Sequence, residues 1–240
     1  MKKLLAFLML PAILLAGCGG PETPPDEDPQ DNPFYNYETE QAKPYSVHYI
    51  ADDFYQTWFD FMQGRQKESE TKHNYSVITS IYDAKPMVEK IVDEKDDNYI
   101  TLIFIGIGPD DYEGGTREAA EANLQKNKDF INSLKDITAP ADVLLHVSTG
   151  FPKAAEETDE HLIWNHEEFR LFVADLREST NDRVFVFAAN RALVNDEGSI
   201  KEEYIDENNI LNEAGFSKLT ADFLSYLGII AGRITRDTRE

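Results

Sequence analysis

Apolar residues recur in two alternating patterns from residue 45 onward. Short apolar runs typical of strands occupy residues 45–50, 75–81, 99–107, 141–147 and 183–188. Apolar positions at helical spacing separate them, over residues 52–63, 87–92, 116–134, 167–176 and 213–227. The run YITLIFIGI at 99–107 is almost continuously apolar, which indicates a strand buried on both faces. This alternation predicts a three-layer α/β/α sandwich around a five-stranded parallel sheet.

The first 17 residues have the layout of a secretory signal peptide. Lys2 and Lys3 supply a basic start, and an uncharged, mostly apolar run follows to Gly17. That run is short for a transmembrane helix, which needs about 20 apolar residues. The sequence LAGC at positions 15–18 resembles a bacterial lipobox, which implies that Cys18 is lipidated and becomes the mature N-terminus.

Residues 18–44 are rich in proline and acidic residues and lack periodic apolar positions. Such a segment buries too little apolar surface to offset its ordering entropy, so we expect an extended tether. Residues 45–240 form the predicted domain. The sequence therefore predicts a secreted protein, lipid-anchored to the cell envelope. Gly19 stands where an aspartate would signal retention in an inner membrane, which favours the outer membrane if the cell is Gram-negative.

The chain is strongly acidic, with a formal net charge of −22 and a pI near 4.5. The acidic residues are spread through the domain as well as the tether. This charge argues against nucleic acid or an anionic lipid surface as a partner. It is compatible with cations, with neutral glycans, or with a purely solubilising role.

Carboxylates follow several of the predicted strands. Asp52 and Asp53 follow the first, Asp110 and Asp111 follow the third, and Asp206 precedes the last helix. Ligands of open α/β sheets bind beyond the carboxyl ends of the strands, so these side chains could converge there. A hard cation such as Ca²⁺ would offset their mutual repulsion. The alternatives are helix capping by Asp52 or Asp53, exposure to water, or a catalytic carboxylate pair of Asp53 with Asp110 or Asp206.

Three motifs resemble those of the SGNH/GDSL hydrolases, which have a flavodoxin-like fold. The sequence ADD at 51–53 stands where the family has Gly-Asp-Ser, and GPDD at 108–111 where it has Gly-x-Asn-Asp. The sequence DENN at 206–209 stands where the family has Asp-x-x-His, and LNEAGF at 211–216 matches the family's following segment. The resemblance covers most of residues 45–230.

The departures from the family bear on its mechanism. Asp53 replaces the nucleophilic serine, Asn209 replaces the histidine base, and Asp110 replaces the asparagine that helps to bind the oxyanion. An ionised carboxylate repels an oxyanion and only accepts hydrogen bonds, and an amide is no base near pH 7. The resemblance therefore implies the SGNH fold without the serine-esterase mechanism.

Two functions follow from these observations. The first is a non-hydrolytic, membrane-anchored lipoprotein that binds a glycan, a cation or an envelope partner. The second is an envelope esterase or deacetylase that acts on an acylated carbohydrate by an altered mechanism. We expect no required cofactor, with Ca²⁺ as the one candidate ion. Elsewhere, Ser148 is expected in a loop, and Trp164, between His161 and His166, in a surface loop where it could stack on a sugar.

Overall fold

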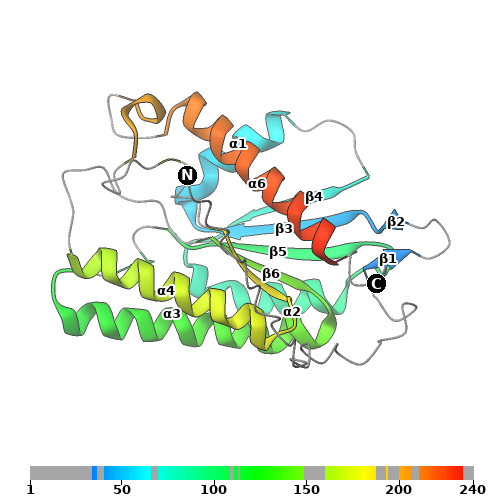
Figure 1. The fold of residues 1–240 in the computed structure, drawn as a ribbon, viewed down its shortest axis with the longest axis horizontal. Coiled ribbons are helices and arrows are strands. Elements are labelled where there is room, and N and C mark those ends of the chain that lie inside the picture. The colour runs from blue at the N-terminus through cyan, green and yellow to red at the C-terminus, as the bar shows by residue number, and fades with distance from the viewer. Residues whose placement is uncertain are drawn as a thin grey trace, which may run out of the picture.

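The computed structural model describes residues 34–36, 41–65, 70–108, 111–112, 114–148, 160–187, 193, 200–206 and 211–234 of the 240-residue chain. Figure 1 shows these residues as a twisted sheet with helices on both sides. Cys18, Asp110 and Asn209 lie outside the described residues.

The sheet has five parallel strands, in the order β4-β3-β5-β6-β7. The central strand is completely buried, as its apolar run predicts. The strands are β3 (Tyr45–Ala51), β4 (Lys72–Val77), β5 (Ile100–Gly106), β6 (Leu144–Ser148) and β7 (Val184–Phe187). The predicted five-stranded parallel sheet is therefore confirmed.

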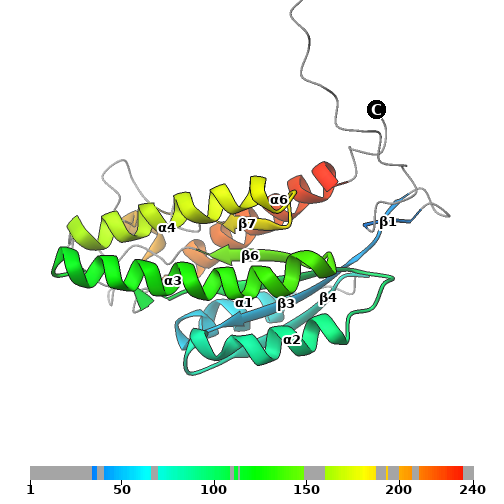
Figure 2. The same ribbon diagram turned by 90° about the horizontal axis from the view of Figure 1, so that it is seen from below.

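Helices cover the sheet on both faces, which confirms the three-layer arrangement (Figure 1), and Figure 2 looks onto the face covered by α2, α3 and α4. Helices α1 (Gln56–Arg65) and α6 (Glu213–Ile234) pack on one face. Helices α2 (Lys85–Asp93), α3 (Arg117–Thr138) and α4 (Glu160–Ser179) pack on the other. Short 3-10 turns lie at η2 (Asp53–Tyr55), η3 (Ile81–Ala84), η5 (Ala139–Ala141) and η7 (Glu202–Tyr204).

Aromatic side chains build the core on the α1–α6 face. Trp58 is 1% exposed, and its indole N–H donates to Thr220 Oγ1 at 2.9 Å, joining α1 to α6. Phe104 and Phe223 pack against it with ring centroids 5.7 and 5.8 Å away. The indole fills the core without leaving its polar atom unpaired.

Some predicted boundaries are wrong, for identifiable reasons. The second strand spans Lys72–Val77 instead of 75–81, because β4 is an edge strand whose residues are exposed or half-buried. The fourth begins at Leu144 instead of 141, since the chain first makes η5 and turns at Asp142 with φ of 54°. Helix α4 begins at Glu160 instead of 167, so Trp164 lies in a helix and not in a loop.

The last part of the predicted tether is folded onto the domain. Strands β1 (Tyr35–Asn36) and β2 (Gln41–Ala42) pair antiparallel, and the Lys43 N–H donates to the Phe34 carbonyl at 3.0 Å. Phe34 is 3% exposed and belongs to the core on the α1–α6 face. We call residues 34–36 and 41–44 the amino-end clasp. The expectation of a purely extended tether is wrong for these residues, because Phe34 supplies apolar burial.

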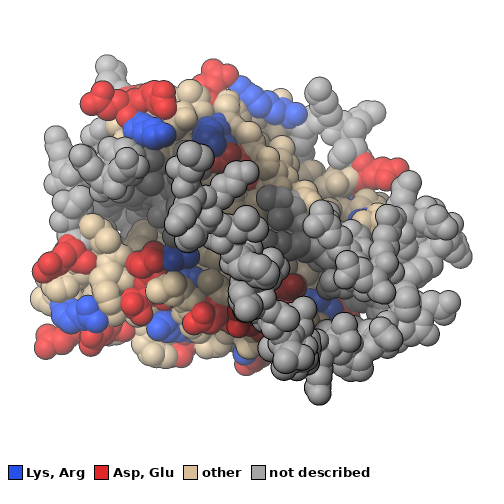
Figure 3. All heavy atoms as spheres, viewed as in Figure 1, with Lys and Arg blue, Asp and Glu red and all other residues tan. Residues whose placement is uncertain are grey.

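The charged surface mixes both signs. Figure 3 shows acidic side chains alternating with lysines and arginines along the α3–α4 side of the molecule. Several form exposed ion pairs within one helix, such as Arg117 with Glu121 and Arg170 with Glu167. Such pairs contribute little to stability. Among the described helices, none is both long and apolar enough to cross a membrane.

Candidate functional site

The candidate site lies where β3 and β5 end, at the carboxyl edge of the sheet. We call residues 51–54, 107–108 and 111–112 the mouth. Asp52 follows β3 and caps η2, because its Oδ1 accepts the Phe54 N–H at 3.1 Å. This confirms the predicted capping role for Asp52. Asp53, the first residue of η2, is exposed. One aspartate therefore points into the mouth and the next into solvent.

Asp52 forms a carboxyl pair with Asp111. Burial, the charge of Asp111 and a hydrogen bond between the two carboxyl groups together raise the pKa of Asp52 to about 7. Gly108 permits the approach, because a Cβ at that position would lie only 2.1 Å from Asp52 Oδ2. Near pH 7 the pair therefore shares a proton.

Asparagines hold the backbone of Asp111 in place. Asn123 and Asn127 of α3 both donate from Nδ2 to the Asp111 carbonyl, at 3.0 and 3.2 Å. Asn165 of α4 donates to Asn123 Oδ1 at 2.9 Å, and the Tyr82 hydroxyl donates to Asn127 Oδ1 at 2.7 Å. Helices α3 and α4 thus hold the backbone of one member of the pair through a polar network.

Tyr55 and Ser148 lie beneath the mouth. Both are fully buried, and the Tyr55 hydroxyl lies 3.1 Å from Ser148 Oγ and 3.2 Å from the Ile107 carbonyl. Burial raises the pKa of Tyr55 well above its ordinary value, so its hydroxyl stays protonated and donates. Ser148 is the last residue of β6, so its predicted place in a loop is wrong. Neither position offers an exposed nucleophile.

The predicted calcium cluster is only partly assembled. Among the described residues, no group of three or more histidine, cysteine or acidic side chains could hold a metal ion. Asp52 and Asp111 meet, whereas Asp53 and Asp206 are exposed. Asp110 lies outside the described residues, so the calcium site stays a prediction. Among the described residues the carboxylates that meet are Asp52 and Asp111, and the pairing of Asp53 with Asp110 or Asp206 stays a prediction.

Asn212 organises the loop that carries Asp206. Its Oδ1 accepts the Gly215 N–H at 3.0 Å and caps α6. Its Nδ2 donates to the carbonyls of Glu203 and Ile205, each at 3.0 Å. One side chain thus joins the start of α6 to the segment before Asp206.

Aromatic side chains lie at the mouth and at the adjoining start of α4. Phe54 is 46% exposed directly beside Asp53. In α4, Trp164 receives the Arg117 guanidinium 3.4 Å above its ring, and the His166 ring lies 4.0 Å from that of Tyr112. Burial lowers the pKa of His166 to about 4, so it is neutral near pH 7. Phe54 therefore offers an exposed apolar face, whereas Trp164 shares one face with an arginine.

Comparison of the fold with solved structures decides its class. The acetylxylan esterase of Geobacillus stearothermophilus aligns with a TM-score of 0.54 at 16% identity, covering 78% of this chain and 96% of that one. A GDSL-like lipase from Bacteroides thetaiotaomicron aligns with a TM-score of 0.48 at 13% identity, covering 80% and 96%. The domain has an SGNH/GDSL hydrolase-like fold. No protein-family model and no curated protein matches the sequence.

Asp53, which the sequence resemblance aligns with the family's serine, carries an exposed carboxylate directly after β3. The fully buried His146 of β6 has a pKa that burial lowers to about 3. A histidine shielded in this way cannot exchange protons with a substrate in the mouth.

Sequence reasoning missed the residues that support the carboxyl pair. It named Asp52 and Asp111 but not Tyr55, Asn123 or Asn127. A signal was present for Asn127, which is completely buried on the apolar side of α3 with Leu124 and Ile131. A buried amide on an apolar helix face needs hydrogen-bond partners. Here Asn127 finds one in the backbone carbonyl of Asp111 at the mouth.

Replacement of Gly108 by alanine is expected to destabilise the protein by about 1–3 kcal/mol, because the new methyl group overlaps the Asp52 carboxyl group. The displaced Asp52 should separate from Asp111, so its pKa should fall toward the ordinary value. Carboxyl ¹³C NMR titration and urea denaturation measure the two effects. Gly64→Ala in α1 is the control, because a Cβ there meets nothing within 4 Å. An unchanged Asp52 titration in Gly108→Ala would contradict the assignment of the pair.

Proposed function

We propose that this protein is a membrane-anchored lipoprotein whose SGNH/GDSL-like domain binds an uncharged glycan at the mouth without the serine-esterase mechanism. The observation that carries the proposal is the exposed carboxylate of Asp53 at the family's nucleophile position, next to the Asp52–Asp111 pair. The substitutions at Asp110 and Asn209 support it from the sequence.

The chemistry of acyl transfer argues against hydrolysis by the family's route. That route needs a nucleophile, an adjacent base and hydrogen-bond donors directed at the developing oxyanion. Asp53 lacks the hydroxyl nucleophile that this route uses, and a negative charge there would oppose an oxyanion beside it. Asn209 supplies no base, because an amide does not titrate in this range.

Charge and aromatic exposure favour an uncharged glycan as the ligand. The net charge of −22 disfavours polyanions, and carboxylates readily accept hydrogen bonds from sugar hydroxyls. Phe54 presents an exposed ring next to Asp53, and the apolar face of a sugar can pack against such a ring. The similar acetylxylan esterase of Geobacillus stearothermophilus provides a carbohydrate precedent for this fold.

The Asp52 carboxyl group favours the second function, an esterase or deacetylase with an altered mechanism. A carboxyl group with a pKa of about 7 is suited to general-acid catalysis at neutral pH. In this alternative Asp52 donates a proton to the leaving alcohol, while Asp53 activates water as a base. Hydrolysis would then fall as the pH rises above about 7, because Asp52 loses its proton.

An assay of the protein on acetylated xylo-oligosaccharides is expected to show binding without release of acetate. Binding is measured by titration calorimetry and acetate by NMR, for the parent, Asp53→Ala and the control Asp60→Ala. Asp53→Ala should weaken binding roughly 5- to 10-fold, because it removes a hydrogen-bond acceptor worth about 1–1.5 kcal/mol. Asp60 is exposed on α1 outside the mouth, so its replacement should change little. Acetate release that Asp53→Ala abolishes would establish the esterase function instead.

A further inference from the structure

The amino-end clasp fixes where the N-terminal chain enters the fold. The Ile100 N–H donates to the Pro44 carbonyl at 2.8 Å, which joins the clasp to the first residue of β5. The Arg183 guanidinium lies 4.6 Å from the Phe34 ring centroid and also binds Asp142 at 3.0 Å. The clasp is therefore bound at the amino ends of β5 and β7, and it leads directly into β3.

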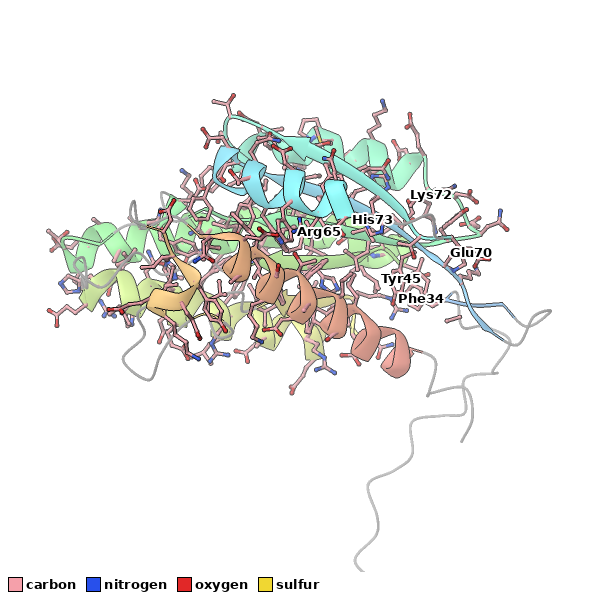
Figure 4. All side chains as sticks on the ribbon, turned by 90° about the horizontal axis from the view of Figure 1, so that it is seen from above. Phe34, Tyr45, Arg65, Glu70, Lys72 and His73 are labelled. Carbon is pink, nitrogen blue, oxygen red and sulfur yellow. The ribbon has the colours of Figure 1, made fainter. Side chains whose placement is uncertain are left out.

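The mouth lies at the opposite end of the same strands. Strands β3 and β5 each have seven residues, which separates their two ends by roughly 20 Å. In Figure 1 the clasp strands lie at the right, whereas α3 and α4 begin at the left. Figure 4 shows Phe34 and Tyr45 beside Lys72 and His73 of the neighbouring strand, all at the clasp end. Because the strands are parallel, every loop of the mouth is on the side away from the clasp.

The length of the tether limits how the domain can turn toward a membrane. Sixteen peptide steps lead from Cys18 to Phe34, so this segment spans at most about 55 Å when fully extended. As a flexible chain it would span about 20 Å on average. A domain of this size is about 40 Å across. Bringing the mouth to the membrane would therefore require most of the full extension of the tether, at a large cost in chain entropy.

Exposed carboxylates at the mouth also disfavour its contact with an anionic membrane. The exposed carboxylates of Asp53 and Asp206 are repelled by the anionic headgroups common in bacterial membranes. At the clasp end, Lys72 lies 3.7 Å from the Tyr99 ring and 3.5 Å from Asp96, and Arg183 is bound to Asp142. The clasp end therefore carries basic groups as well as acidic ones.

We infer that the mouth faces away from the membrane that anchors the protein, and that its ligand is a glycan outside this bilayer and not one of the bilayer's own lipids. This inference rests on the lipid anchor at Cys18 in the proposed function. The clasp then orients the domain. It fixes the chain that leads to the anchor at the amino ends of the strands, so the carboxyl ends point away from the membrane.

Energy transfer to the membrane surface tests the orientation. Cys18 is the only cysteine, so the chain from Cys18 onward can be coupled to maleimide-bearing lipid in phosphatidylcholine–phosphatidylglycerol vesicles. A donor dye is attached through a keto amino acid at position 54 in the mouth, or at position 97 before β5, where the Asp97 side chain is 86% exposed. The acceptor is a headgroup-labelled lipid.

Transfer from position 97 is expected to be at least about twofold more efficient than from position 54, because the positions differ in height by roughly 20 Å. Equal transfer, or stronger transfer from position 54, would overturn the inference. This result depends neither on cellular lipidation nor on glycan binding. Cys18→Ser in the producing bacterium tests the anchor separately: it should move the protein from the membrane fraction to the soluble fraction, and retention in the membrane would remove the basis of the inference.

Discussion

His146→Leu is expected to stabilise the protein by about 1–3 kcal/mol at pH 7 and by about 3 kcal/mol more at pH 4. His146 is fully buried in β6, and neither ring nitrogen has a hydrogen-bond partner. Its ring packs against two aromatic rings, with Phe185 at 5.1 Å and Tyr226 at 5.3 Å between centroids. Leucine of similar size removes two unsatisfied polar atoms from this apolar site.

The additional gain at pH 4 follows from proton linkage. Burial lowers the pKa of His146 from 6.5 to about 3, so the folded protein keeps the ring neutral at pH 4 while the unfolded chain protonates it. The stability of the parent therefore falls as the pH drops from 6.5 toward 3. At pH 4 the loss is about 2.5 pKa units, or about 3 kcal/mol. The leucine variant has no such loss at this position.

Urea denaturation at pH 7 and pH 4 measures both effects for the parent and His146→Leu. The control is His161→Leu, at a partly exposed position near the start of α4. Its replacement should leave the difference between the two pH values close to that of the parent. A His146→Leu protein that loses as much stability between pH 7 and pH 4 as the parent would show that His146 does not remain neutral in the folded state.

The fold could be predicted because buried parallel strands are visible in the sequence as apolar runs. Strand β5 is completely buried, and its run of seven apolar or small residues identifies it without tertiary information. The same rule fails for β4 at the edge of the sheet, because its sequence KHNYSV begins with three polar residues and contains no apolar run. It also fails for Phe34, because a single anchoring aromatic ring within an acidic, proline-rich segment has no periodic pattern around it.

The site could be predicted only as a set of candidates. Parallel strands bring their carboxyl ends to one edge of the sheet, so residues that follow a strand are candidates for a site. This rule identified Asp52, Asp53, Asp111 and Asp206. Which of them meet depends on loop geometry, such as the approach that Gly108 permits, and on the asparagines of α3 that hold Asp111. Neither feature leaves a local pattern in the sequence, because the contacts join residues that lie far apart along the chain.

Phe34→Ala is expected to lower the free energy of unfolding by about 3 kcal/mol, a large effect for a residue expected to lie in a tether. The ring is 3% exposed, and it packs in the core and against the Arg183 guanidinium. Its removal leaves a cavity, and replacing a buried phenylalanine by alanine costs about 3–5 kcal/mol. We expect the lower end of this range, because the clasp can partly collapse into the cavity. Urea denaturation measures the change.

Phe54→Ala provides the matched control for this prediction. The same atoms are removed, but Phe54 is 46% exposed at the mouth, so its loss should cost less than about 1 kcal/mol. Glycan binding should respond in the reverse order, because Phe54 contributes to the proposed binding surface and Phe34 lies at the far end of the strands. Equal destabilisation by the two substitutions would mean that the clasp is not packed against the core. In that case the N-terminal chain would not enter at a fixed point, and the orientation of the mouth away from the membrane would lose its structural cause.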